Sequence, residues 1–343
     1  MEQSQFAEAA AVLQNPAFLQ CDPRADLLIA AAFEGRGDTA LARDTLNQAH
    51  NIWPSDDGIA TSLARYDLAA GQIDKAAIAL QHFRATPAMP WQEIQMAAVV
   101  LLASHQLTSA EATARTGYKA HPSIQSLLLL ANTIQLEGRY KDVIALLGGK
   151  RDAYNNDPAF LVTLAESEFD SAIYDGARSD VEHAISLNPN IYAAHYLLGN
   201  LFLKLGDPDS AAAQYRIGLQ LEPNQPRTYY YLALALRAQH NEASEESILA
   251  KAIALDNRYA LAHCEMGRIY LNQNRLPDAV AQLKLAIDDN ASSEQAYYLL
   301  ARAYDRLGDK ASAQEMSKQL TLVRRAKHQP SDHLPDAAPV QAP

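Results

Sequence analysis

The stretch from Tyr192 to Pro223, YAAHYLLGNLFLKLGDPDSAAAQYRIGLQLEP, decides the fold of this chain. It has a small residue at Gly199 and another at Ala211, and Gly206 lies between them. Small residues let two helices approach closely, and a glycine between two helical patterns ends the first helix. The spacing therefore predicts two helices in a helix–turn–helix unit that repeats every 34 residues.

The same phase can be followed through nine units, and independent positions agree on it. Their first positions fall at residues 23, 57, 91, 124, 158, 192, 226, 260 and 294. The seventh position is apolar throughout, and the eighth is alanine or glycine every time. The twentieth position is alanine in all units except two, which have Val143 and Glu245. Repetition of this kind predicts one long array of stacked helix pairs.

Residues that favour turns occur between the predicted helices. Glycine occupies the fifteenth position of five units, and Asn274 occupies it in a sixth. Glycine, and after it asparagine, adopts the left-handed conformation that closes a helix. Prolines at the thirty-second position stop the second helix before the next unit begins. These prolines are Pro54, Pro122, Pro189 and Pro223.

This pattern resembles the tetratricopeptide repeat family over residues 23–327. The resemblance implies an all-α fold, an α-α superhelix that forms a right-handed solenoid. It also implies that the first helices line a concave groove while the second helices form the convex back. We expect a leading helix at 1–22, the repeat array at 23–327 and a disordered tail at 328–343. The helix from about Lys310 to Lys327 is polar enough to act as a solubilising cap.

Charge and composition exclude several classes of partner. The formal net charge is −11, with 13 basic against 23 acidic residues in 1–190 and 14 against 12 in 225–327. Nucleic acids and anionic membranes require a basic surface, so neither is an expected partner. The longest apolar run, Met96 to Ala103, is too short to cross a bilayer. No signal peptide is recognisable at the N-terminus, and a cytoplasmic location is expected.

Two places depart from the repeat. Gly148 and Gly149 fall inside the second helix of the fourth unit, so this helix should end early. The junction at 148–157 is then a longer loop or, as an alternative, a hinge. Glu245 replaces the small residue at the twentieth position of the seventh unit, which suggests a locally shifted second helix.

No catalytic, metal or cofactor site is predicted. Gly148-Gly149-Lys150 lacks the Ser or Thr of a phosphate-binding loop, and no Gly-x-Ser-x-Gly elbow occurs. His263, Cys264 and Glu265 are consecutive, so on a helix they point about 100° apart and cannot share one metal ion. His195 and His263 occupy a packing position of the repeat and are interpreted as structural. The acidic residues show no paired arrangement, and we expect a protein that is not an enzyme.

The resemblance places positions two, five, nine and twelve of each first helix in the groove. Tyrosine there offers a large contact area, and arginine can bind a carboxylate with two hydrogen bonds. Packing tyrosines and solvated arginines are the alternative interpretation. The predicted partner-binding residues are Asn132, Tyr196, Asn200, Tyr230, Arg237, Cys264, Arg268, Tyr298 and Arg302.

Three functions remain open. The first is a protein-interaction scaffold that binds a peptide segment or partner protein in the groove, with acidic groups facing Arg268 and Arg302. The second is a regulator that responds to a ligand or signalling peptide. The third is a substrate-recruiting subunit of an enzyme or of a secretion or assembly machine. The family's clamp for a peptide carboxylate needs lysine at position five and asparagine at position nine. Asn132 instead follows Leu128, and Asn200 follows Tyr196, so binding of chaperone C-termini is not predicted.

Overall fold

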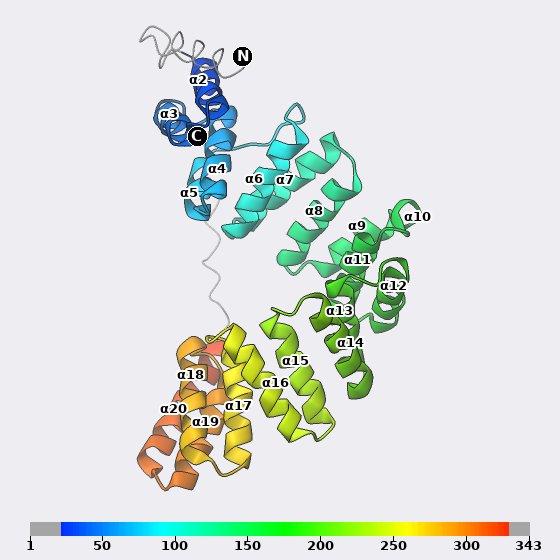
Figure 1. Cartoon of the computed structure of the whole chain (residues 1–343), viewed down its shortest axis with the longest axis vertical. Coiled ribbons are helices and arrows are strands. Elements are labelled where there is room, and N and C mark those ends of the chain that lie inside the picture. Colours follow the sequence, from blue (N-terminus) through cyan, green and yellow to red (C-terminus); the bar gives the residue numbers. More distant parts are fainter. Residues whose placement is uncertain (1–21, 329–343) are drawn as a thin grey trace, which may run out of the picture. The chain divides into compact units, whose positions relative to one another are not determined.

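The computed structural model describes residues 22–328, and this part of the chain contains helices and turns but no strand. The predicted leading helix at 1–22 and tail at 328–343 lie outside the described part except for their boundary residues, of which Asp22 caps the next helix and His328 still belongs to the last helix. The described helices follow one another in pairs along the chain (Figure 1).

The first helix of every pair begins at the first position of a predicted repeat. These helices are α2 (Pro23–Gly35), α4 (Asp57–Ala69), α6 (Trp91–Ala103), α8 (Ile124–Leu136), α11 (Pro158–Asp170), α13 (Tyr192–Lys204), α15 (Pro226–Ala238), α17 (Ala260–Asn272) and α19 (Glu294–Leu307). Their starts have local causes. The side chains of Asp56 and Asp157 accept hydrogen bonds of 2.9 Å from backbone amides in the first turns of α4 and α11. Such caps satisfy amides that have no partner inside the helix.

The second helices complete the pairs and differ more in length. They are α3 (Thr39–Ile52), α5 (Ile73–Ala79), α7 (Leu107–Ala120), α9 (Tyr140–Gly148), α12 (Tyr174–Leu187), α14 (Pro208–Leu221), α16 (Glu242–Leu255), α18 (Leu276–Asp289) and α20 (Lys310–His328). α9 ends early at Gly148, as predicted, and the one-turn helix α10 (Arg151–Tyr154) follows it. α5 has only seven residues, a shortening that the repeat pattern did not reveal.

One turn geometry joins the two helices of every pair. The fifteenth position of each repeat has a positive φ, between 59° and 83°. Five of these residues are the predicted glycines, and Asn274 is the sixth. The other three are His105, Ala172 and His240, which the sequence did not mark as turn residues. The position therefore imposes the left-handed conformation even on residues that disfavour it.

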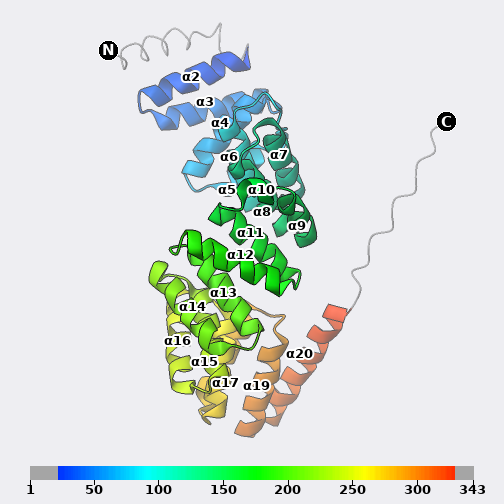
Figure 2. The same cartoon turned by 90° about the vertical axis from the view of Figure 1, so that its right-hand side faces the viewer.

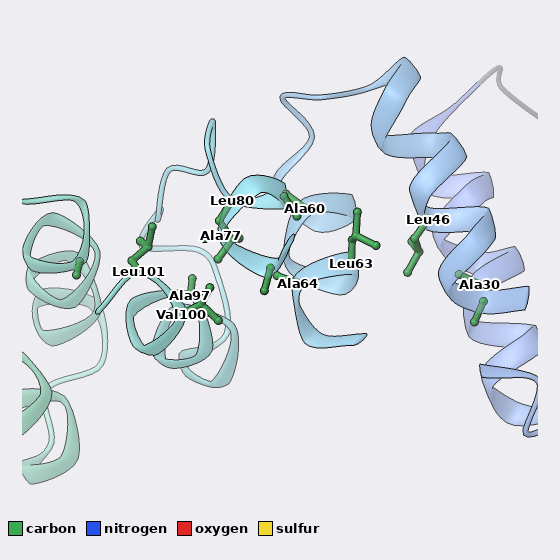
Figure 3. Packing of buried hydrophobic residues seen from close by; sticks show 14 of the residues in the cluster. Ala30, Leu46, Ala60, Leu63, Ala64, Ala77, Leu80, Ala97, Val100 and Leu101 are labelled. Carbon is green, nitrogen blue, oxygen red and sulfur yellow. The ribbon is translucent and has the colours of Figure 1, made fainter. Parts of the chain in front are cut away.

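The helices divide into two compact bodies, residues 1–177 and 178–343, with the division inside α12. In the N-terminal body, alanine and leucine side chains of successive helices form a continuous core (Figure 3). Ala64 and Ala97, for example, are fully buried between neighbouring helices. Small side chains let the helix backbones approach, and close packing of many such contacts stabilises the array. Sequential pairing of this kind is typical of the α-α superhelix fold.

The C-terminal body contains α13 to α20, each packed against its neighbours in the chain (Figure 2). At Gly199 on α13, an added Cβ would lie 2.6 Å from a ring carbon of Tyr215 on α14. The predicted shift of the second helix at Glu245 is wrong. α16 begins and ends at the same repeat positions as α14 and α18, and Glu245 is buried within this regular packing.

Candidate partner-binding surface

Most of the predicted partner-binding residues lie on first helices of the C-terminal body. They are distributed over α13, α15, α17 and α19, whereas Asn132 is exposed on α8 of the N-terminal body. The structure places seven of the eight residues of the C-terminal body in three environments, and Cys264 lies in the core. The three environments are an aromatic cluster, a buried network of ion pairs and a hollow between α19 and α20.

The tyrosine cluster comprises Tyr192, Tyr196, Tyr215, Tyr230, Tyr231 and Tyr259. Neighbouring ring centroids are 5.3 to 6.2 Å apart, in stacked, tilted and edge-on arrangements. Aromatic pairs at these separations stabilise each other beyond the area that they bury. The prediction named only Tyr196 and Tyr230. The other four rings come from different repeat positions and from the second helix α14, so spacing along one helix face did not link them.

Hydroxyl groups of the cluster differ in how well they are satisfied. The Tyr215 hydroxyl donates to Asn200 Oδ1 at 2.7 Å, and Tyr192 is hydrogen-bonded to Thr228. The Tyr196 hydroxyl is buried beside Asn200, but no hydrogen bond of good geometry satisfies it within residues 22–328. Burial raises the pKa of Tyr196 well above its ordinary value, so the hydroxyl keeps its proton. Asn200 is thus engaged inside the cluster, and Tyr196 retains an unused hydroxyl.

Arg227 adds a positive charge to the tyrosine cluster. It is exposed at position two of α15, one of the positions assigned to the groove. Its guanidinium carbon lies 5.4 Å from the ring centroid of Tyr196 and 5.8 Å from that of Tyr231. Cation–π contacts of this kind hold the side chain in place. Arg227 forms no ion pair with a carboxylate in the described part of the chain. Arg227 was not among the residues predicted from the sequence, although its repeat position was the available signal.

Two of the predicted arginines form ion pairs with buried glutamates of this chain, and we call this group the buried ion-pair network. Arg237 Nη1 lies 2.7 Å from Glu265 Oε2, and Arg268 Nε lies 2.6 Å from the same oxygen. Arg268 Nη2 also forms an ion pair with Glu245 Oε1. Glu245 is fully buried and Glu265 is 4% exposed. The sequence therefore did not reveal that Glu245 and Glu265 both bind Arg268. Arg268 is not free for a partner's carboxylate, because two buried glutamates of this chain already occupy it.

The two glutamates of this network have opposite electrostatic environments. Burial raises the pKa of Glu245, and the attraction of Arg268 only partly offsets this effect. Burial acts in the same direction on Glu265, but hydrogen bonds and charges from Arg268 and Arg237 hold the pKa of Glu265 below its ordinary value. The presence of Glu245 at a position that is otherwise small was the sequence signal for this network.

The prediction for Cys264 is also wrong. Its side chain is 3% exposed and packs in the core between α17 and its neighbours, so it cannot contact a partner. Burial raises the pKa of the thiol to about 12. The adjacent His263 has the predicted structural role, with its ring nitrogens 2.7 Å from Gln282 Oε1 and 3.0 Å from the Asn257 carbonyl. His195 makes the equivalent contacts with Gln214 and Pro189.

The remaining two predicted residues, Tyr298 and Arg302, line a hollow of about 690 Å³ between α19 and α20. Tyr298 is 50% exposed, and the Arg302 guanidinium carbon lies 5.7 Å from its ring centroid. Arg302 has no carboxylate partner among residues 22–328. We call this site the end hollow, and its other lining residues include Ala301, Asp305, Lys310, Ala313, Ser317, Lys318 and Leu320.

Comparison with known proteins supports the repeat assignment. The tetratricopeptide repeat family model matches residues 162–226, 196–260 and 264–315, which include the tyrosine cluster, the ion-pair network and the α19 side of the end hollow. The chain is a tetratricopeptide repeat protein. Repeats of this family are protein-interaction modules. No group of His, Cys, Asp or Glu within residues 22–328 is arranged to hold a metal ion, and no helix there is long and apolar enough to span a membrane.

Two similar proteins illustrate the extent of the likeness. A Hsp70-Hsp90 organizing protein of Triticum aestivum is 34% identical over 101 residues, which are 29% of this chain and 16% of that protein. The match therefore covers a small part of the relative. A solved tetratricopeptide repeat protein from Parabacteroides merdae ATCC 43184 is 15% identical, with a TM-score of 0.50 over 68% of this chain and 98% of that one. At this identity the likeness concerns the fold alone.

Proposed function

We propose that this tetratricopeptide repeat protein is a non-enzymatic scaffold that binds an extended peptide segment of a partner protein at the tyrosine cluster. The observation that carries the proposal is Arg227, an exposed cation held over two tyrosine rings without a carboxylate partner among the described residues. Tyrosine and arginine are the residue types most enriched at binding hot spots.

The peptide is expected to carry an acidic group beside an apolar or aromatic residue. A guanidinium binds a carboxylate through two parallel hydrogen bonds, and this geometry favours an acidic side chain over a neutral one. The rings offer a flat apolar surface next to this charge. The unused hydroxyl of Tyr196 supplies a donor for a peptide carbonyl once a small rearrangement exposes it. This assignment replaces Arg268 by Arg227 as the cation that faces the partner.

The similarity to the Hsp70-Hsp90 organizing protein raises chaperone C-termini as an alternative ligand. The tyrosine cluster does not favour it. Asn200, which would serve a carboxylate clamp, instead accepts a hydrogen bond from Tyr215. Its companion at position five is Tyr196 rather than a lysine. An internal acidic segment, which needs no free C-terminal carboxylate, suits the site better.

A selection from a displayed library of random peptides tests the proposal. Peptides recovered with the wild-type chain are titrated by calorimetry against the wild type, Arg227→Ala and Arg227→Lys. The alanine variant is expected to bind about tenfold more weakly or worse, equal to about 1.4 kcal/mol. Lysine should restore part of the affinity, because it keeps the charge but loses the planar fork.

Arg216→Ala is the matched control, since Arg216 is an exposed arginine on α14 outside the tyrosine cluster. It should bind as the wild type does. Equal weakening of binding by both alanine variants, or no effect of either, would show that the tyrosine cluster does not bind the peptide. Peptides that share a free C-terminal carboxylate, and that lose affinity on C-terminal amidation, would instead favour the chaperone-type ligand.

A further inference from the structure

The end hollow lies where the stacking of repeats leaves one face uncovered. Positions twenty, twenty-four and twenty-seven of each second helix pack between the first helix of their own repeat and the first helix of the next repeat. Tyr215, for example, lies against Gly199 of α13 and against Tyr231 of α15. In the three repeats before the last these positions are all buried: Ala211, Tyr215 and Gly218; Glu245, Leu249 and Ala252; Ala279, Leu283 and Ala286. In the ninth repeat the same positions hold Ala313, Ser317 and Leu320, and none of these is buried.

The covering element at each internal position is an α-helix. α15 packs on α14, α17 on α16 and α19 on α18 (Figure 1). α20 packs beside α19 within the last repeat (Figure 2), and within residues 22–328 no helix follows that would cover the outer side of this pair. The face of α19 and α20 is therefore shaped for a helix, since its repeat positions are the ones that a helix occupies three times in this body.

The lining of the hollow is not that of a simple polar cap. A capping face needs long polar side chains that fill the surface. Here Ala301 and Ala313 leave a hollow of about 690 Å³, and Tyr298 is half-exposed at its rim. A hollow bounded by small residues and an exposed aromatic ring fits an inserted apolar side chain.

The charge around the hollow specifies the kind of helix. Arg302, Lys310 and Lys318 line it against a single acidic residue, Asp305. Arg302 and Lys310 have no ion pair in the described chain, and Lys318 is 73% exposed with only a 3.9 Å approach to Glu315. A helix that carries carboxylates complements this rim, whereas a basic helix is repelled.

Internal repeats already use this complementarity. Asp67 on the incoming helix α4 lies 2.6 Å from Arg43 on α3 of the preceding repeat. Glu265 on α17 is bound in the same way by Arg237 on α15. Arg65 on α4 and Arg268 on α17 make the reverse pairing, with Glu34 and Glu245 of the repeat before them. An incoming first helix thus brings the charge that is opposite to the one it meets.

We propose that the end hollow binds an amphipathic, acidic α-helix of a partner protein, which packs on α19 and α20 as the first helix of a further repeat would. Its apolar side chains contact Tyr298, Ala301 and Ala313, and its carboxylates pair with Arg302, Lys310 and Lys318. This surface is separate from the tyrosine cluster, so a negative result at one site does not contradict the proposal for the other.

Calorimetric titration of the full chain with a synthetic helix provides the test. The probe is an end-capped peptide of residues 157–170, DPAFLVTLAESEFD, which has the repeat's first-helix pattern, four carboxylates and no basic residue. Its own Asp157 caps the helix in this chain, with a 2.9 Å bond to the Phe160 amide. The control peptide has Glu166→Gln, Glu168→Gln and Asp170→Asn.

The wild type should bind the acidic peptide at least about tenfold more tightly than the control peptide. Arg302→Glu/Lys318→Glu should lose the same factor, and Ala313→Trp should abolish binding by filling the hollow. Lys204→Glu/Lys251→Glu makes the same charge change on exposed lysines of α13 and α16, and should bind normally. Arg227→Ala should also bind normally, which separates this site from the tyrosine cluster.

Three results would overturn the proposal. The first is failure of the wild type to bind the acidic peptide, and the second is binding that survives Ala313→Trp. The third is self-association of the wild type in analytical ultracentrifugation that Arg302→Glu/Lys318→Glu abolishes. That last result would make a second copy of this chain the occupant of the hollow.

Discussion

Left-handed residues at the fifteenth position show how strongly the repeat constrains single residues. Alanine at φ 61°, as at Ala172, is strained by about 1–2 kcal/mol relative to its preferred backbone regions. Glycine has no such strain, and Gly37, Gly206 and Gly308 adopt the same conformation at the equivalent position. The packing of the two helices therefore supplies the energy that holds Ala172 in place.

Ala172→Gly is expected to stabilise the protein. Relief of the backbone strain exceeds the extra entropy of glycine in the unfolded chain, so the net gain should be about 0.5–1 kcal/mol. The same substitution at the exposed Ala250, inside α16, should cost about 1 kcal/mol. Urea denaturation followed by circular dichroism compares the two. A loss of stability in both variants would contradict the strain at Ala172.

Cys264 is expected to be unreactive in the folded protein. Burial raises its pKa to about 12, so at pH 8 almost no thiolate is present, and the side chain is 3% exposed. In a Cys21→Ser background, a thiol reagent should modify Cys264 only after denaturant is added. Rapid modification of the native protein would show that α17 opens readily.

Individual helices are held together by charged as well as apolar contacts, and the buried ion-pair network is the clearest example. Arg268→Ala would leave Glu245 fully buried without its counter-charge, and should destabilise the protein by about 3–5 kcal/mol. Arg302→Ala removes an exposed arginine that has no ion pair in the described chain, and should change stability by less than about 0.5 kcal/mol. Chemical denaturation separates these outcomes, and similar values for both variants would contradict the network.

The pH dependence of stability should report Glu245 directly. The pKa of Glu245 is raised in the folded state, so folding favours its protonated form. Its contribution to stability is therefore greatest below about pH 4.3, the ordinary pKa of glutamate. This contribution is lost as the pH rises through the raised pKa. Glu245→Gln does not titrate. The free energy of unfolding of this variant relative to the wild type should therefore increase from about pH 4 to about pH 7. A flat or falling difference would show that Arg268 offsets burial completely.

The sequence predicted the helices better than it predicted the chemistry of their side chains. Repeat position five drew attention to Tyr196 and Tyr230, which lie in the tyrosine cluster, and their contact with a partner stays a prediction. The prediction failed for Cys264, because the short side chain at this position stays within the core. It failed for Arg268 because Glu245 and Glu265 lie 23 and 3 residues away, and the larger separation becomes a contact only when helices of neighbouring repeats stack.

At the scale of the whole molecule, stability should vary along the array. None of the side chains of α20 described between residues 310 and 326 is buried, whereas α17 has eight buried residues. Amide hydrogens of α20 should therefore exchange with solvent much faster than those of α17. Hydrogen exchange with mass spectrometry measures this difference. Equal protection of the two helices would contradict it, and added acidic peptide 157–170 should slow exchange in α20 if the end hollow binds it.

The repeat phase also explains which large features were predictable. Positions of the first helices follow from the 34-residue spacing because each depends on local residues such as Asp56 and Pro158. The short α5 did not follow, because its end depends on the loop that the chain takes before α6. The end hollow could not be predicted either. It exists because no helix follows α20 within the described chain, and no sequence motif of its own marks it.

The left-handed turn at the fifteenth position of every repeat has a consequence for how the number of repeats changes in evolution. All of these turns share a positive φ, and an alanine or glycine lies at the eighth position of every repeat. A genetic exchange that deletes or duplicates the segment between two of them rejoins helices that already fit each other. The number of repeats can therefore change by whole repeats while the surfaces of the remaining repeats keep their shape. Selection can then change the length of the array without changing the packing of its core.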